Sequence, residues 1–291
     1  MKPAPFDYHL PDSALEAASL LAEYGDNAKL LAGGQSLIPL LALRMAVFEH
    51  LIDLRRVDSL AGVECTPGWV RLRAMTTEAT IGTDPDVRSG VPLLARATPL
   101  IGHFQIRNRG TIGGSIAHAD AAAEYPAVAL TLDAVMEAVS PRGYREVPAS
   151  EFFTGVWETR LDSDEVLTAI RFPVWDGRCG FAVEEFARRH GDFAIAGAIV
   201  ALELGPGDLV ARIAVGLFGL GATPERSRHA EAAVTGVPVS DIDPAELGQL
   251  AVSELAAIPS DLHGSAGYRT KVGAEMVARA WKRAREEAGK R

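Results

Sequence analysis

Cysteine is scarce in this 291-residue chain, which contains only Cys65 and Cys179. Two thiolates cannot supply the four ligands of an iron–sulfur cluster or of a structural zinc site. Two cysteines so far apart in the sequence also give no disulfide framework of the kind found in small secreted proteins. We therefore expect the chain to work in a reducing compartment, the cytoplasm.

The chain also lacks a long apolar run. The most apolar stretches, residues 37–48 and 194–204, are broken or ended by Pro39, Arg44 and Glu203, so neither reaches the roughly 18–20 residues of a membrane span. The N-terminal segment places Pro and Asp where a signal peptide requires an apolar core. We therefore expect neither secretion nor a membrane span.

Basic residues are outnumbered by acidic ones. Lys and Arg total 29 against 38 Asp and Glu, which gives a net charge of −9. This charge repels a phosphate backbone, so nucleic acid is not an expected partner. Hydrophobic residues make up 48% and charged residues 23%, which excludes a disordered, collagen-like or coiled-coil chain. At roughly 150 residues per domain, the length predicts about two domains.

The N-terminal part of the sequence predicts a small α/β unit. Its expected elements, in chain order, are a helix over 12–24 capped by Asp12 or Ser13, a strand over 28–32, a helix over 37–45 and a strand over 47–53. The turn at 33–36, between the first strand and the second helix, carries two glycines.

Beyond residue 53 the pattern changes from α/β to α+β. The expected elements are antiparallel hairpins over 62–81, a helix over 84–101, an ordered loop over 109–120, a helix over 122–130 and strands at 135–140, 145–148 and 165–173. The C-terminal part predicts a small antiparallel sheet from 181–188, 194–204 and 210–218, followed by helices over 226–236, 244–257 and 265–288.

Two glycine loops are the candidate functional features. Residues 32–36 (AGGQS) place backbone N–H groups at a helix start, where the helix dipole favours an anion such as a pyrophosphate. Residues 111–115 (TIGGS) repeat the paired glycines beside a small hydroxyl residue. For the first loop, a plainer interpretation is a tight turn in which Ser36 caps the next helix. Neither loop matches the GxGxxG fingerprint, and no P-loop is present.

A resemblance to a known family is carried by three segments: AGGQSLIPLLALR (32–44), LIGHFQIRNRGTIGGSIAHADAAAEYP (100–126) and EEFARRHGDFAIAGA (184–198). In this order they resemble the flavin-binding medium subunit of molybdenum hydroxylases, a group that includes carbon monoxide dehydrogenase and bacterial nicotine and purine dehydrogenases. The resemblance spans nearly the whole chain. It implies an α+β fold with a vanillyl-alcohol-oxidase (PCMH)-type FAD-binding domain over 1–177, made of two α/β lobes (about 1–53 and 54–177). A C-terminal domain over 178–291 would combine a three-stranded antiparallel sheet with a helix bundle.

The resemblance also implies which residues bind FAD. The two loops that hold the pyrophosphate and ribityl chain correspond to Ala32, Gly33, Gly34, Gln35 and Ser36, flanked by Leu37, and to Thr111, Ile112, Gly113, Gly114 and Ser115. Positions beside the adenine or flavin edge, or beside the isoalloxazine ring, correspond to Ile101, Leu161, Asp192 and Phe193. Some relatives have Tyr in place of Phe193, so its hydrogen bonding does not carry over, whereas stacking or shielding does.

Acidic residues complete the implied site. Glu124 corresponds to an acid that hydrogen-bonds sugar or ribityl hydroxyls, and Asp120 is a second candidate. Glu124 also fits a plainer interpretation, a first-turn acid favoured by the helix dipole. His118 lies two residues before Asp120, but nothing else supplies a third or fourth metal ligand, so no metal site is expected.

The function implied by the resemblance is that of an FAD-carrying electron-transfer subunit, with no catalytic acid or base of its own. It would accept electrons from [2Fe–2S] clusters on a small partner subunit and pass them to an external acceptor, while a large molybdopterin-binding subunit oxidises the substrate. The resemblance allows a dimer of heterotrimers, and attachment at the inner membrane through the complex. Two alternatives stay open: a self-sufficient FAD oxidase of the same fold, and a flavin-free assembly module.

Overall fold

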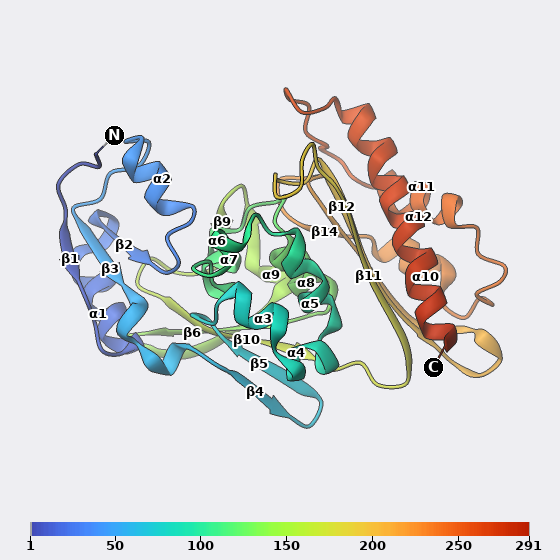
Figure 1. Cartoon of the computed structure of the whole chain (residues 1–291), viewed down its shortest axis with the longest axis horizontal. Helices are drawn as coiled ribbons and strands as arrows, with labels where there is room; N and C mark the ends of the chain where they lie inside the picture. Colours follow the sequence, from blue (N-terminus) through green and yellow to red (C-terminus); the bar gives the residue numbers. More distant parts are fainter. Residues whose placement is uncertain (1, 291) are drawn as a thin grey trace.

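The computed structural model describes residues 2–290, which are arranged around three larger sheets (Figure 1). The N-terminal lobe, on the left of Figure 1, is a parallel sheet in the order β1-β3-β2 (Asp7–His9, His50–Asp53, Ala28–Leu31) with helices α1 (Ala14–Tyr24) and α2 (Leu37–Ala42). Ser13 caps α1, because its hydroxyl accepts the N–H of Glu16 at 3.1 Å. Strand β1 was not predicted from the sequence.

The central lobe is an antiparallel sheet in the order β4-β5-β10-β6-β7 (Val63–Thr66, Trp69–Arg73, Val166–Pro173, Val135–Ser140, Gly143–Pro148). Alternation along β5 turns Val70 and Leu72 into the core. The helices of this lobe are α3 (Glu78–Thr83), α4 (Pro85–Gly90), α5 (Pro92–Ala97), α6 (Phe104–Arg107), α7 (Ile112–His118), α8 (Glu124–Thr131) and α9 (Ala149–Phe152). The hairpin β8–β9 (Phe153–Gly155, Glu158–Thr159) follows α9.

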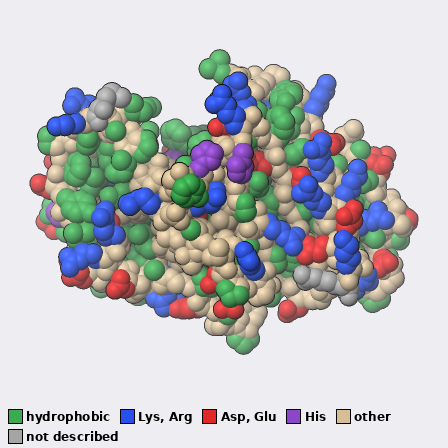
Figure 2. Space-filling model, viewed as in Figure 1, with side chains coloured by type: hydrophobic (Ala, Val, Ile, Leu, Met, Phe, Trp, Pro, Cys, Tyr) green, Lys and Arg blue, Asp and Glu red, His purple; other side chains and the backbone are tan. Residues whose placement is uncertain are grey.

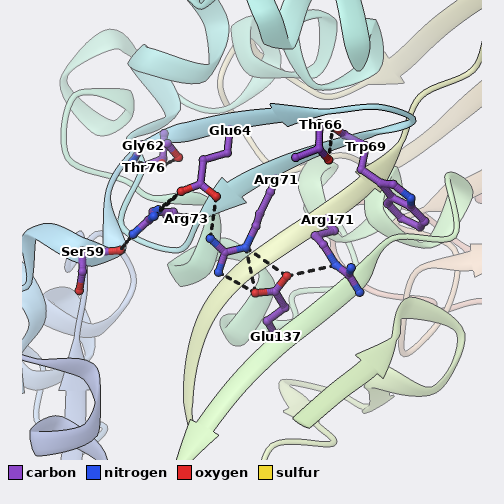
Figure 3. A network of polar contacts seen from close by, with 10 residues as sticks. All are labelled: Ser59, Gly62, Glu64, Thr66, Trp69, Arg71, Arg73, Thr76, Glu137 and Arg171. Atoms are coloured by element: carbon purple, nitrogen blue, oxygen red, sulfur yellow. Dashed lines mark hydrogen bonds and ion pairs between the residues drawn. The ribbon is translucent and has the colours of Figure 1, made fainter. Parts of the chain in front are cut away.

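The outer face of the central sheet carries a chain of ion pairs that spans strands β4, β5, β10 and β6 (Figure 3). Arg71 contacts Glu137 at 2.7 Å and Glu64 at 3.0 Å, and Arg73 also pairs with Glu64. Arg171 pairs with Glu137 at 3.1 Å. Opposite charges on facing strands stabilise the sheet register, so these residues have a structural explanation and do not need a ligand.

The C-terminal sheet has the order β11-β12-β13-β14 (Arg178–Phe186, Ala196–Leu204, Val210–Phe218, Glu225–Arg226). One face packs on the central core through residues such as Ile199, and the other packs under helix α12 (Ala266–Lys290) through residues such as Val200. Strand β12 is therefore buried on both faces, and Trp281 is the largest side chain completely covered there. Helices α10 (Arg228–Val234) and α11 (Pro244–Ser253) complete the right-hand part of Figure 1.

Several local predictions were wrong for identifiable reasons. Residues 109–120 were expected to form a loop, but 112–118 form helix α7, whose two glycines hide its helical pattern in the sequence. The single helix expected over 84–101 is broken before Pro92, because proline has no backbone N–H to donate. The hairpins expected to reach residue 81 end at Arg73.

The C-terminal sheet has four strands, because β14 pairs with Gly216 and Leu217. Three strands were expected, since a two-residue strand is too short to show an alternating pattern in the sequence. Short 3₁₀ helices occur at Gly25–Asn27, Leu54–Arg56, Asp58–Leu60, Thr98–Leu100 and Pro206–Asp208. Among residues 2–290, no helix combines the length and apolar character needed to cross a bilayer.

Candidate functional site

The first glycine loop connects β2 to α2. Gly34 has a φ of +74°, a conformation that favours glycine, and its carbonyl accepts the N–H of Ile38 at 3.0 Å. The Gln35 side chain donates to the Gly33 carbonyl at 2.9 Å. Within the described part of the chain, the backbone N–H groups of residues 33–36 donate no hydrogen bond, and Ser36 does not cap α2 with its side chain. The loop therefore keeps a row of donors free for a ligand.

The second glycine loop is attached to the central sheet. The N–H of Ile112 donates to Thr76 at 3.1 Å, and the N–H of Gly113 donates to Ala74 at 2.8 Å. Thr111 caps α7 by accepting the N–H of Gly114 at 3.1 Å. Ser115 follows within the helix. These bonds hold the start of α7 at the end of β5.

The two loops lie directly against each other. A Cβ atom on Gly33 would lie 2.2 Å from the Arg109 carbonyl oxygen, and a Cβ atom on Gly114 would lie 3.5 Å from the Cβ of Ala32. Residues almost eighty positions apart in the sequence thus form one surface. A single ligand at this surface would contact both loops.

A cavity of about 340 Å³ opens beside the first loop. Its lining comprises Leu31, Gly33, Gly34, Gln35, Ile38, Pro39, Arg55 and Arg109. Arg55 is held by the buried Asp53 at 2.7 Å, and Arg109 lies two residues before Thr111. Free N–H groups and two guanidinium groups around one cavity fit a pyrophosphate. Sequence reasoning missed both arginines, although Arg109 adjoins the motif.

The visible face of the molecule is hollowed between the N-terminal lobe, on the left, and the centre (Figure 2). Lys, Arg and His side chains lie near this hollow, although the chain as a whole is acidic. The positive charge of the Lys and Arg side chains there attracts an anionic ligand in spite of the net charge of −9.

Asp120 is occupied by local contacts. Its carboxylate accepts the N–H of Ala122 at 2.9 Å and the indole N–H of Trp157 at 3.3 Å. His118 stacks on Trp157, with ring centroids 5.9 Å apart. These contacts shape the segment between α7 and α8. The described residues contain no group of three His, Cys, Asp or Glu side chains that could hold a metal ion.

Glu124 is the first residue of α8 and is 8% exposed. Burial raises its pKa to about 8, and the nearby charge of Glu185 adds to the shift. Burial also raises the pKa of Glu185 to about 7, while a side-chain hydrogen bond with Glu124 acts in the opposite direction. Two carboxyl groups in mutual contact cannot both ionise easily, so the pair retains a proton near neutral pH.

Glu78 lies next to the second loop, and sequence reasoning did not identify it. A Cβ atom on Gly110 would lie 2.5 Å from a Glu78 carboxyl oxygen, and the Glu78 N–H donates to the Gly110 carbonyl at 2.9 Å. Burial raises the pKa of Glu78 to about 7, partly offset by Arg107. The Oε2 atom of Glu78 is buried without a hydrogen-bond partner among the residues of the structure.

Two further predicted segments lie against each other. Arg107 donates to the carbonyls of Ile101 and Gly102 at 2.8 and 2.9 Å. A Cβ atom on Gly191 would lie 3.0 Å from the Gly102 carbonyl oxygen, so the turn that carries Asp192 and Phe193 packs beside Ile101. Phe193 is 66% exposed, which leaves its ring available to a planar ligand.

Leu161 follows β9, is half-buried and packs against the central core. Its N–H donates to the Thr159 hydroxyl at 3.4 Å. Leu161 is not among the residues that the contacts above bring together. The same is true of Leu37, which begins α2 next to the first loop.

Comparison with known proteins gives two family matches. Residues 4–175 match the FAD binding domain in molybdopterin dehydrogenase, and residues 181–284 match the CO dehydrogenase flavoprotein C-terminal domain.

The chain is 40% identical to the alpha subunit of the 6-hydroxypseudooxynicotine dehydrogenase complex of Paenarthrobacter nicotinovorans, over 96% of this chain and 94% of that protein. It is 39% identical to the carbon monoxide dehydrogenase medium chain of Hydrogenophaga pseudoflava, over 96% and 97%. A chain in the structure of carbon monoxide dehydrogenase from Hydrogenophaga pseudoflava matches with a TM-score of 0.94, 39% identity and 99% coverage of both chains. The expected mixed α+β fold, with an FAD-binding domain and a C-terminal domain, is confirmed.

Proposed function

Because the chain belongs to the FAD-binding medium subunits of the molybdenum hydroxylase family, we propose that it carries electrons from [2Fe–2S] clusters of a partner subunit, through its FAD, to an external acceptor. The observation that carries this proposal is the meeting of the two glycine loops beside a cavity lined by Arg55 and Arg109. The chain is an oxidoreductase subunit with FAD as its cofactor.

The proposed binding roles combine the site geometry with the family resemblance. The free N–H groups of residues 33–36 and the two cavity arginines hold the FAD pyrophosphate, and the start of α7 approaches it from the other side. By the family resemblance, Glu124 would hydrogen-bond the sugar or ribityl hydroxyls, and the turn with Phe193 would shield the isoalloxazine ring. When bound, FAD supplies reversible one- and two-electron chemistry.

The domain division proposed for this function is 1–177 for FAD binding and 178–291 for the C-terminal part. The family matches end and begin at residues 175 and 181, which supports a boundary near 177. Strand β11 starts there, at Arg178, and leads directly into the C-terminal sheet.

The proposal requires partner subunits, because this chain has too few cysteines to hold an iron–sulfur cluster. Two cysteines cannot hold a [2Fe–2S] cluster, so the clusters belong to a small partner subunit. Substrate oxidation belongs to a large molybdopterin-binding subunit. The relatives include a carbon monoxide dehydrogenase medium chain and a caffeine dehydrogenase subunit, so the substrate of this complex is set by the large subunit rather than by this chain. We place the complex in the cytoplasm.

The decisive experiment is anaerobic bleaching of the flavin near 450 nm, the usual band of oxidised flavin. The purified FAD-loaded chain is mixed with candidate substrates, first alone and then with the large and small partner subunits. We expect substrate-dependent bleaching only in the presence of both partners. Rapid bleaching of the chain alone would instead establish a self-sufficient oxidase. A protein that binds no flavin after reconstitution would be the assembly module.

A second readout tests electron delivery separately from substrate oxidation. The FAD-loaded chain, reduced chemically and freed of excess reductant, is mixed with a tetrazolium dye. We expect stoichiometric dye reduction, because reduced flavin passes its electrons to an external acceptor. Reduced flavin that transfers no electrons to any dye would contradict the electron-transfer role.

A further inference from the structure

Arg269 is a buried cation outside the residues assigned above. It lies in the first turn of α12, is 4% exposed, and donates through one terminal nitrogen to the carbonyls of Ile195 at 2.5 Å and Gly219 at 3.0 Å. Its other terminal nitrogen contacts both carboxylate oxygens of Asp261 at 2.9 and 2.7 Å. One guanidinium therefore connects three separate segments of the chain.

The bond to Ile195 reaches the proposed flavin turn. The N–H of Ile195 donates to the Phe186 carbonyl at 2.8 Å, which closes the connection between β11 and β12. That connection contains Gly191 and Phe193. Because Arg269 holds the carbonyl of Ile195 while Phe186 holds its N–H, the base of the turn is fixed on both sides.

The bond to Gly219 reaches the acidic segment. Gly219 has a φ of +73°, and a Cβ atom there would lie 2.9 Å from the Ala194 carbonyl oxygen, so its backbone is pressed against the end of the same turn. The N–H of Gly219 donates to the Ala121 carbonyl at 2.7 Å. Ala121 stands between Asp120 and Glu124. The Arg269 contacts thus continue into the segment expected to bind the FAD hydroxyls.

The carboxylate of Asp261 offsets the free-energy cost of burying the positive charge of Arg269. Its carboxylate faces Arg269 and also accepts the N–H groups of His263 at 2.8 Å and Gly264 at 3.2 Å. These bonds, led by that of Arg269, lower the pKa of Asp261 to about 2. The carboxylate of Asp261 therefore stays ionised throughout the physiological pH range.

We propose that Arg269, held by Asp261, is a positioning residue for the FAD site, which sets the Gly191–Ala194 turn against the Asp120–Glu124 segment. This inference rests on the proposed function, because it takes the turn to lie beside the flavin ring. The guanidinium acts through the backbone of Ile195 and Gly219 and does not itself contact the cofactor.

A matched control separates positioning from simple structural support. Arg226 is also a buried arginine of the C-terminal part, with a side chain 7% exposed. It pairs with Glu231 at 2.7 Å and Asp133 at 2.6 Å, and its contact with α8 is at Leu130, near the opposite end from Glu124. Its loss should cost stability without moving the turn.

The experiment compares R269M, R269K and R226M in the full chain. We measure the dissociation constant of FAD by fluorescence quenching, the visible circular dichroism of the bound flavin at saturating FAD, and the Tm of the FAD-free protein. For R269M we expect an FAD dissociation constant at least tenfold higher than that of wild type. We also expect loss of at least half of the flavin circular dichroism. R269K should recover part of both, because an ammonium still faces Asp261. R226M should lower the Tm by an amount comparable to that of R269M. Its FAD dissociation constant and its flavin circular dichroism should stay within twofold of wild type.

Equal flavin readouts for R269M and wild type, at lowered Tm, would overturn the proposal. If R269M does not fold, D261N supplies the test, because Asp261 is 44% exposed at its side chain and its replacement leaves the guanidinium in place. We then expect a severalfold weaker FAD affinity and altered circular dichroism, and wild-type values for D261N would refute the inference. Failure of the proposed function shows separately, as absence of substrate-dependent bleaching in wild type with both partners.

Discussion

Replacing Gly33 by alanine tests the junction between the two glycine loops. The new Cβ would lie 2.2 Å from the carbonyl oxygen of Arg109 and 2.8 Å from the Cα of Gly110. Both neighbours are backbone atoms, which cannot turn aside as the end of a side chain can. One loop must therefore shift by roughly 1 Å or more to restore ordinary contact distances.

The size of the effect follows from this shift. Overpacking of a close contact typically costs about 1–3 kcal/mol of stability. In the proposed site, displacing the loop would also remove at least one hydrogen bond from a backbone N–H to a phosphate, at about 1.5–3 kcal/mol for a charged acceptor. That loss corresponds to an FAD dissociation constant about ten- to hundredfold higher than that of wild type.

The assay is titration of FAD with the FAD-free protein, followed by flavin fluorescence, together with thermal unfolding of the same preparations. The control is G289A, because a Cβ atom on Gly289 in α12 meets no atom within 4 Å. We expect G289A to bind FAD as wild type does. An FAD dissociation constant for G33A within twofold of wild type would refute the loop junction as the pyrophosphate site.

Three other substitutions give separate predictions. Burial raises the pKa of Glu124 to about 8 and of Glu185 to about 7. The folded chain therefore holds more protons than the unfolded chain between pH 4.5 and 8. Its free energy of unfolding falls as pH rises through that range. E185Q should therefore gain more Tm over wild type at about pH 8.5 than at about pH 5, as thermal unfolding of the FAD-free protein will show. G114V should weaken FAD binding about tenfold or more, measured by fluorescence titration, while the protein stays folded. Asp243 caps α11 through the N–H groups of residues 245 and 246, so D243A should lose about 0.5–2 kcal/mol in denaturant unfolding with unchanged FAD affinity.

Local signals in the sequence were sufficient for the elements with strong caps or regular alternation. Ser13 caps α1 as its side-chain chemistry predicts, and alternation along β5 buries Val70 and Leu72. Strand β12 reads as a continuous apolar run because it is covered on both faces. Such elements depend on residues within one turn or one strand.

Elements that depend on distant contacts could not be predicted in the same way. Helix α7 contains Gly113 and Gly114, which have low helix propensity, and it is held by bonds from its first turn to Ala74 and Thr76. The sequence around residue 112 carries no sign of those bonds. Strand β14 likewise exists only because β13 offers it an edge.

The candidate site shows the same division. The glycine loops were visible as motifs, whereas Arg55, Glu78 and Arg269 enter through tertiary contacts with segments far away in the sequence. A lone arginine or glutamate carries no pattern that distinguishes it from a solvated side chain. Family resemblance assigns a ligand to the glycine loops because it transfers a solved arrangement, which residue spacing alone does not contain.

This dependence on distant contacts links FAD binding to the stability of the fold. The first loop belongs to the parallel sheet of the N-terminal lobe, whereas the second is bonded to the central sheet at Ala74. A ligand that contacts both loops binds the folded arrangement and not the unfolded chain, so it stabilises the protein in proportion to the logarithm of its concentration. The two lobes are therefore expected to unfold together when FAD is bound. The N-terminal lobe should lose the most protection from hydrogen exchange when FAD is removed, because its loop retains free N–H groups at residues 33–36.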